Sequence, residues 1–120
     1  MRIPPLFLAL PILGGCSLGN ELAGDASVGG RVTQSSGLPL GNSAVVADCA
    51  GGVGRNIVSI DSAGWYTANL TAPATGRIRC TFAVPDLANA RIRVDTVIGF
   101  GPSGQLHPLQ VLNLHETTTP

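Results

Sequence analysis

The feature that most constrains the fold is a strict alternation of side-chain types in the segment Gly76–Val84. Four apolar residues alternate there with polar or small ones, in the order Arg77, Ile78, Arg79, Cys80, Thr81, Phe82, Ala83, Val84. A period of two is that of a β-strand whose side chains point to opposite faces of a sheet. The segment is therefore expected to be a strand with one buried face and one solvent-facing face that carries arginines.

Similar strand-like runs recur roughly every ten residues between turn signals, which is the spacing of an antiparallel sandwich. The expected strands are Ser27–Gln34, Ala44–Cys49, Asn56–Ile60, Trp65–Leu70, Gly76–Val84, Arg91–Phe100 and Leu109–Leu114. Sixteen Gly and nine Pro, with only 12% charged residues, disfavour long helices. We expect an all-β chain, a seven-stranded antiparallel β-sandwich with no helix.

Residues 1–15 have the pattern of an export signal peptide. A basic residue, Arg2, precedes the apolar run Leu6–Leu13, and two small residues separate that run from Cys16. The run is far shorter than the ~20 residues needed to span a bilayer. These residues are therefore excluded from the fold.

The tetrapeptide Leu13-Gly14-Gly15-Cys16 resembles the lipobox of bacterial lipoproteins. The resemblance implies that the Cys16 thiol receives a diacylglycerol, that a peptidase cuts before it, and that the new amino terminus is acylated, for example with palmitate. Several acyl chains make a stable membrane anchor. Ser17 stands where Asp would favour inner-membrane retention, so the resemblance favours the outer membrane of the bacterial cell envelope. The alternative is an ordinary secretory signal cut near Gly14-Gly15, which would leave Cys16 as a free thiol.

The cysteine count is consistent with this interpretation. Three Cys in an exported chain leave one unpaired, and lipidation of Cys16 removes it. Cys49 and Cys80 fall on inward faces, so facing sheets or neighbouring strands could bring them within disulfide range. The alternative is two reduced cysteines in the core. The expected organisation is a signal peptide (1–15), a flexible tether (16–26), the sandwich (27–115) and a disordered tail (116–120).

Several segments of the body resemble carboxypeptidase regulatory-like, or transthyretin-like, domains. They are Gly30-Arg31-Val32-Thr33, Gly37-Leu38-Pro39-Leu40, Ala44-Val45-Val46-Ala47 and Ser59-Ile60-Asp61-Ser62-Ala63-Gly64-Trp65-Tyr66. The resemblance covers about Ser27–Leu114 and implies a Greek-key sandwich of the transthyretin-like or immunoglobulin-like type. It also implies a turn at Asp61–Gly64 and an inward Tyr66. Domains of this family are mostly non-enzymatic supports, spacers and surface or sugar-facing modules.

Candidate catalytic and metal-binding residues are few. His107 and His115 flank the expected last strand without further ligands at metal-binding spacing, so surface positions are expected. Asp61 is one carboxylate before Gly64, which favours turn capping over calcium binding. The stretch Gly51-Gly52-Val53-Gly54-Arg55 joins two strands and opens no helix, so a hairpin loop is expected instead of a phosphate site. We therefore expect no enzyme activity, no cofactor and no metal.

The candidate binding surface consists of outward-facing residues. Arg77 and Arg79 share one strand face and Arg91 and Arg93 share another, so pairing of those strands would form a basic patch. Such a patch suits anionic glycans or an acidic protein, whereas the alternative is a solvated face that protects sheet edges. Trp65 is expected to be exposed, as suits a sugar or protein contact.

These expectations combine into one function. We expect a monomeric, lipid-anchored lipoprotein whose sandwich binds or supports an envelope protein or glycan without catalysis. The formal net charge is zero, so no nucleic-acid partner is expected. The alternatives are an enzyme or protease-inhibitor module with a site on its loops, and a passive structural spacer.

Overall fold

The computed structural model describes residues 23–85 and 90–118, apart from the side chains of residues 90, 91 and 118. Regular structure in these residues is entirely β, which confirms the all-β prediction. The strands are β1 (Gly24–Thr33), β2 (Ala44–Cys49), β3 (Gly54–Ser59), β4 (Trp65–Ala72), β5 (Gly76–Val84), β6 (Ala90–Pro102), β7 (Gln110–Val111), β8 (Leu114–His115) and β9 (Thr117–Thr118). Within these ranges, no helix has the length and hydropathy needed to cross a membrane.

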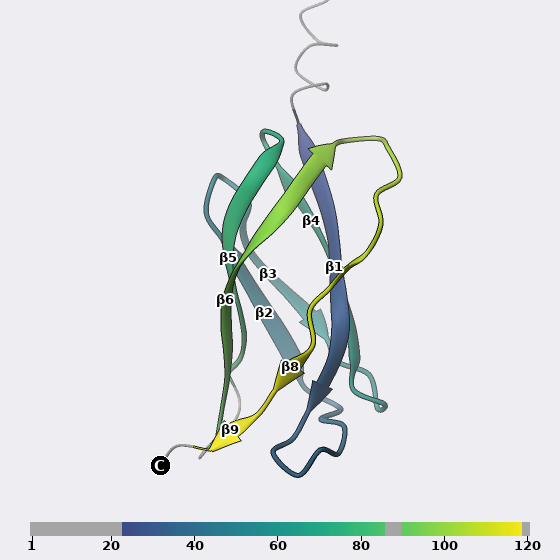
Figure 1. Cartoon of the computed structure of the whole chain (residues 1–120), viewed down its shortest axis with the longest axis vertical. Helices are drawn as coiled ribbons and strands as arrows, with labels where there is room; N and C mark the ends of the chain where they lie inside the picture. Colours follow the sequence, from purple (N-terminus) through teal and green to yellow (C-terminus); the bar gives the residue numbers. More distant parts are fainter. Residues whose placement is uncertain (1–22, 86–89, 119–120) are drawn as a thin grey trace, which may run out of the picture.

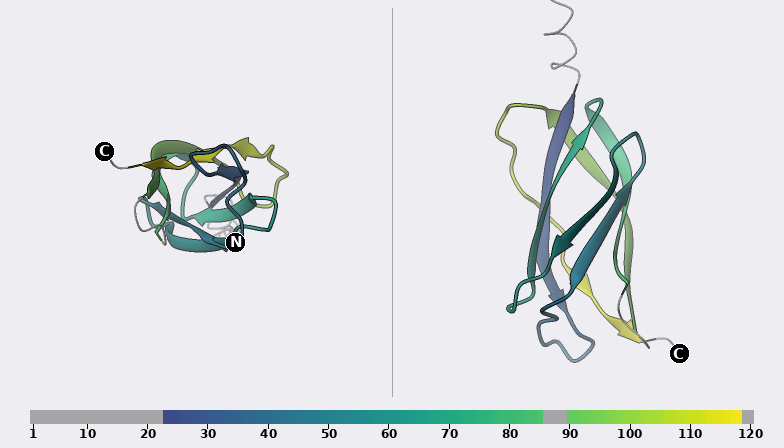
Figure 2. Two further views of the ribbon diagram at one scale, coloured as in Figure 1. Left: turned by 90° about the horizontal axis from the view of Figure 1, so that it is seen from below. Right: turned by 180° about the vertical axis from the view of Figure 1, so that it is seen from behind.

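The six longer strands form one antiparallel sheet in the order β3-β2-β5-β6-β1-β4. β1 and β6 pair only at one end, where Gly24 faces Pro102 and Asp25 faces Gly101. Below this point the two strands diverge (Figure 1). The end view in Figure 2 shows the sheet curled around nearly to a closed, barrel-like shape.

The C-terminal segment fills the gap between β1 and β6 (Figure 1). β7 and β8 run parallel to β1, with Gln110 facing Val28 and Leu114 facing Val32. β9 then pairs antiparallel with the start of β6, where Thr117 faces Arg91. The segment thereby covers backbone of β1 that would otherwise form an open sheet edge.

Side chains hold this C-terminal segment in place. The Tyr66 hydroxyl donates a hydrogen bond of 2.6 Å to the carbonyl oxygen of Leu112. The side-chain amide of Gln110 accepts from the Gly99 N–H at 3.0 Å and donates to the Gly99 carbonyl at 2.8 Å. Burial raises the pKa of Tyr66 above its ordinary value, because the interior disfavours the phenolate.

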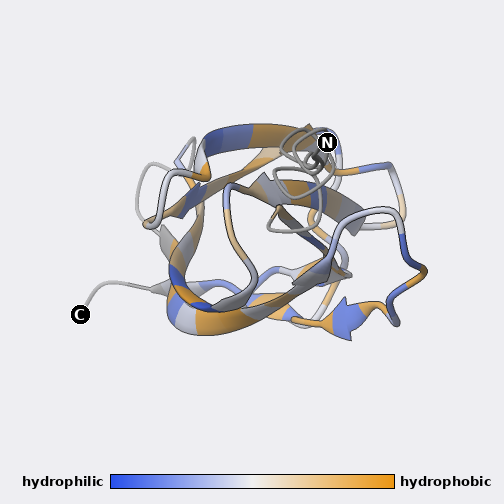
Figure 3. Cartoon of the chain, turned by 90° about the horizontal axis from the view of Figure 1, so that it is seen from above, coloured by the Kyte–Doolittle hydropathy of each residue, from blue (hydrophilic) through white to orange (hydrophobic). Residues whose placement is uncertain are grey.

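The core lies inside the curled sheet, because alternation along each strand sends apolar side chains inward. Figure 3 shows apolar and polar residues alternating along the strands. The largest fully buried side chains come from five of the strands and are Phe82, Leu70, Leu114, Val28, Val32, Val45 and Cys80. Among the described residues, no charged side chain is buried. The core therefore stabilises the fold by apolar burial and one covalent bridge.

That bridge joins Cys49 of β2 to Cys80 of β5. The two residues face each other across neighbouring antiparallel strands, and their Cα atoms are 4.0 Å apart. Of the two arrangements compatible with the sequence, the neighbouring-strand one is observed. The predicted disulfide is thus present, and it fixes the β2–β5 register at the end from which β1 begins.

The tight turn between β3 and β4 confirms the expected capping role of Asp61. Its Oδ1 accepts hydrogen bonds of 2.9 Å from the N–H groups of Ala63 and Trp65. Gly64 has a φ of +90°, which costs an L side chain strain. This geometry sends Tyr66 into the core, where it is 3% exposed, as predicted.

The last predicted strand and two predicted boundaries differ from the structure. The segment Leu109–Leu114 was expected to be one strand. It instead contains β7 and the start of β8, two short strands that pair parallel with the middle and the end of β1. The predicted tether ends within β1, since Ala26 pairs with Leu70 and is 3% exposed. The predicted tail begins at Glu116, but β9 is part of the sheet. Two facing sheets were expected, whereas the structure has one continuous sheet that curls around the core.

Candidate functional site

A concave surface lies on the outward face of the strands β3-β2-β5-β6. Antiparallel pairing brings one residue from each strand into cross-strand rows. One row contains, from β3 to β6, Arg55, Asp48, Thr81 and Asp95, and the next contains Ile57, Val46, Ala83 and Arg93. We call this surface the outer face.

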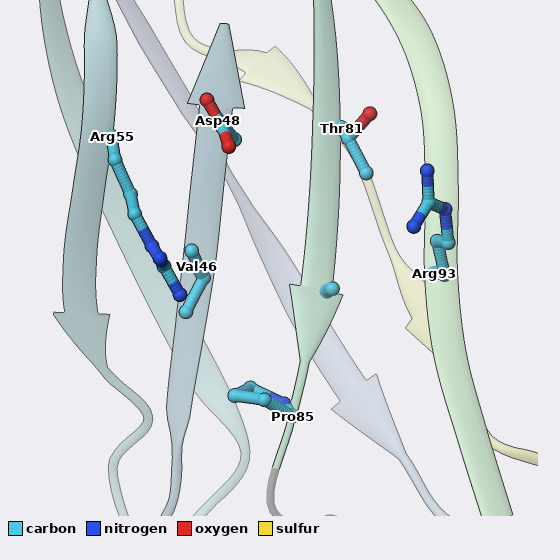
Figure 4. A pocket seen from close by; sticks show the side chains of 7 residues that line it. Val46, Asp48, Arg55, Thr81, Pro85 and Arg93 are labelled. Atoms are coloured by element: carbon cyan, nitrogen blue, oxygen red, sulfur yellow. The ribbon is translucent and has the colours of Figure 1, made fainter.

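A shallow pocket of about 280 Å³ occupies the middle of the outer face. Its lining residues come from all four strands and the turn after β5, and they are Val46, Asp48, Arg55, Thr81, Ala83, Pro85 and Arg93. Figure 4 shows Arg55 extending from β3 toward Val46, while Arg93 stands on β6 at the opposite side. Val46, Ala83 and Pro85 form an apolar part of the floor, Asp48 and Thr81 form a polar part, and guanidinium groups flank both.

The charges on the outer face are only partly compensated. Arg93 lies 3.7 Å from Asp95, with both side chains 62% exposed, so this pair is weak. Asp95 also accepts a hydrogen bond of 2.7 Å from the Thr81 hydroxyl. Within residues 23–85 and 90–118, no ion pair involves Arg55, and none involves Asp48. Two guanidinium groups are thus available to an anionic ligand at the pocket.

The predicted single patch of four arginines is wrong in its arrangement. β5 and β6 pair as expected, but Arg79 faces Val97, which is six residues beyond Arg91, and Arg93 faces Ala83. The register therefore separates Arg77 and Arg79 from Arg91 and Arg93 along the ladder. Arg93 joins the pocket, while the Arg91 side chain lies outside the described residues. The other arginine that lines the pocket is Arg55, which the sequence analysis placed in the hairpin loop Gly51–Arg55.

Trp65 is exposed as predicted, at 52%. It lies at the start of β4, at the opposite end of the strand order from β3. The guanidinium of Arg31 lies 5.7 Å from the indole ring centre, which is within cation–π range. Trp65 therefore does not belong to the pocket surface, and its partner in the fold is Arg31.

The two histidines lie outside the pocket. The Nε2 atom of His107 lies 3.1 Å from Asp25 and 2.8 Å from the carbonyl oxygen of Pro102. His115 Nδ1 is 2.8 Å from the Thr33 hydroxyl. Each histidine therefore helps to hold the C-terminal segment. In the part of the chain that the structure describes, no group of three or more His, Cys, Asp or Glu residues could hold a metal ion.

Cys16, the predicted lipidation site, lies outside the described residues, as do the signal peptide and most of the predicted tether. In comparisons with known proteins, no family model, no curated protein and no solved structure matches this chain.

Proposed function

We propose that this chain is an exported, lipid-anchored binding module without catalytic activity, and that the outer face is its binding surface. The observation that carries the proposal is the pocket, a partly apolar floor flanked by Arg55 and Arg93. Guanidinium groups are well suited to carboxylate and phosphate, because they offer paired donors in a fixed plane. The favoured ligand is therefore anionic.

The spacing of the arginines favours an extended ligand over a small ion. The backbones of Arg55 and Arg93 stand on strands β3 and β6, three strand spacings or roughly 14 Å apart across the sheet. An extended ligand can contact both arginines while lying over the strands between them. We propose a polymer that carries several negative charges and lies across the strands.

An acidic segment of an envelope protein is the ligand that the pocket suits best. Val46, Ala83 and Pro85 offer an apolar floor for side chains, whereas the aromatic platform typical of sugar sites is missing from the lining residues. Trp65, the residue that favoured a sugar, lies elsewhere. An anionic glycan is the second ligand class, and the experiment below distinguishes it.

The anchor and the family resemblance support a module held at the membrane. The lipobox-like residues Leu13–Cys16 follow a basic and apolar leader, which favours acylation of Cys16 and a place in the bacterial outer membrane. The resemblance to transthyretin-like domains extends over about Ser27–Leu114 and favours a support or binding role. We also propose that the fold of this chain is related to the Greek-key sandwich of that family.

Photo-crosslinking from the edge of the pocket tests the proposal in cells. Ile57 is 66% exposed and faces Val46 across β2–β3, so benzoylphenylalanine at position 57 would not disturb the core. We expect one discrete adduct, which is lost in an Arg55→Gln/Arg93→Gln variant. The same label at Thr71, an exposed position of β4, is the control for non-specific capture.

The adduct itself identifies the ligand class. A band that protease digests to a short remnant supports the protein ligand, whereas a protease-resistant ladder would replace it with a glycan. Arg31→Gln is the matched charge control and should leave the adduct unchanged. Absence of any adduct at position 57, or an adduct that survives loss of both pocket arginines, would leave a passive spacer as the better account.

A further inference from the structure

Three loops and the start of β1 gather at one end of the molecule, which we call the proximal end. The loops connect β2 to β3 (50–53), β4 to β5 (73–75) and β6 to β7 (103–109). Ser103 donates a hydrogen bond of 3.0 Å to the Ala23 carbonyl, which joins the third loop to the residue before β1. Figure 1 shows β1 beginning at this end.

The proximal loops contain neither an acidic residue nor an arginine. Their sequences are Ala-Gly-Gly-Val, Pro-Ala-Thr and Ser-Gly-Gln-Leu-His-Pro-Leu. His107 is the one titratable side chain among them, and it contacts Asp25 and the Pro102 carbonyl. The opposite end differs, because Asp61 and Glu116 are found in its connections.

Leu106 stands at the tip of the longest proximal loop with its side chain fully exposed, at 101%. Leu109, further along the same loop, is 49% exposed. The fully exposed side chain of Leu106 has no apolar burial in the folded chain, and an adjacent apolar phase would supply it. Loops without an acidic residue or an arginine, one of which carries a protruding leucine, are thus matched to a lipid surface.

Two exposed arginines lie on β5 next to the proximal loops. Arg77 is the second residue of β5 and Arg79 follows two residues later on the same outward face, and both are exposed. Long basic side chains next to an apolar contact reach the level of anionic headgroups. Their position directly after the β4–β5 loop, at the start of β5, places them at the proximal end.

We propose that the proximal end rests on the lipid surface, with Leu106 inserted and Arg77 and Arg79 at the headgroups. The inference rests on the proposed acylation of Cys16. Only seven residues separate Cys16 from Gly24, so the anchor can stand at most about 28 Å from the fold. A tether this short holds the proximal end within reach of the membrane and leaves the outer face free along the side of the molecule.

Tryptophan fluorescence of the full-length acylated protein in vesicles tests the contact. Trp65 is the only Trp, so Trp65→Phe gives a silent background. Leu106→Trp reports the proximal end, and Leu38→Trp, on a 63% exposed leucine of the loop between β1 and β2, is the matched control. With brominated phosphatidylglycerol and phosphatidylcholine, we expect the indole at position 106 to lose emission and shift to the blue. The indole at position 38 should keep the spectrum of an exposed side chain.

Flotation of the same vesicles separates failure of the anchor from failure of the contact. Protein that floats while the indole at position 106 remains unquenched overturns the lipid contact alone, and a detergent-solubilised dimer that buries position 106 would assign this end to a second copy. Protein that does not float overturns the anchor and the contact together. In the protein with unchanged arginines, brominated phosphatidylglycerol should quench the indole at position 106 more strongly than brominated phosphatidylcholine does. An Arg77→Gln/Arg79→Gln variant should still float but should lose this difference between the two lipids. If the difference remains, these arginines do not take part in the contact.

Discussion

The Cys49–Cys80 bridge is expected to supply a large share of the stability of this domain. It closes a loop with a sequence separation of 31 residues. The chain-entropy relation for a loop of this length gives about 3.7 kcal/mol of stabilisation at 25 °C. Small domains have net stabilities of only about 5–15 kcal/mol, so reduction should remove a substantial part of the margin.

Urea unfolding of the oxidised and the reduced chain measures this contribution directly. With a slope of about 1.2 kcal/mol per molar urea, the midpoint should fall by roughly 3 M on reduction. Near-ultraviolet circular dichroism of Tyr66 follows the transition, because that ring is buried beside Phe82 at a centroid distance of 6.5 Å. The comparison uses one sequence, so the cross-link is the only difference.

A Cys49→Val/Cys80→Val variant provides the control. It fills the same inward positions with apolar side chains and should unfold at one midpoint with or without reductant. If reduction lowers the free energy of unfolding of the wild type by less than about 1 kcal/mol, the reasoning is refuted, because the entropic constraint of a closed loop would then be missing.

Four further predictions concern Tyr66, Gly64 and Gly30. Tyr66→Phe should cost about 1–2 kcal/mol by leaving the Leu112 carbonyl unsatisfied, measured by urea unfolding. Since burial raises the pKa of Tyr66, the native phenol should stay neutral at a pH above ~10, where an ordinary tyrosine ionises, and an absorbance titration shows this. Stability should fall above pH ~10, because the unfolded phenol ionises there while the native phenol stays neutral. Gly64→Ala should destabilise more than Gly37→Ala, because both have positive φ but only the Gly64 Cβ would meet a backbone oxygen, at 2.8 Å; equal losses would contradict this. Gly30→Ala should loosen the C-terminal segment, seen as faster amide exchange at Leu112, because its Cβ would collide with the Leu112 carbonyl.

Local physics made much of this fold readable from the sequence. Alternation along Gly76–Val84 predicts which side chains enter the core, since each side chain of a strand points to the face opposite its neighbour's. The Asp61–Gly64 turn is equally local, because its hydrogen bonds join residues two and four apart. The inward positions of Cys49 and Cys80 followed from the same alternation.

Non-local pairing set the limits of that prediction. The sequence shows that β5 and β6 can pair but not their register, so the shift that moves Arg79 opposite Val97 was invisible. The β2–β3 hairpin brings Arg55 beside the pocket by the same kind of register. The one sequence signal for the position of Arg55 was its spacing of two residues from Ile57, which is typical of side chains on the same face of a strand.

The course of the C-terminal segment could not be read locally either. Parallel pairing with β1 joins residues about eighty positions apart, and nothing near Gln110 or Leu114 encodes it. The curled sheet is also a non-local feature, because β1 pairs with β6 only through Gly24 and Asp25, nearly eighty positions from their partners. The expectation of two facing sheets therefore differed from the structure at this point.

Both proposals begin at Cys16, so the intact mass of the mature chain tests the account most directly. Protein purified from bacterial membranes should begin at Cys16 and carry the added mass of a diacylglyceryl group and an amide-linked acyl chain. A Cys16→Ser variant should lose this mass and leave the membrane fraction. A mature chain cut near Gly14-Gly15, with an unmodified Cys16 thiol, would contradict the anchored module and the lipid-facing end alike.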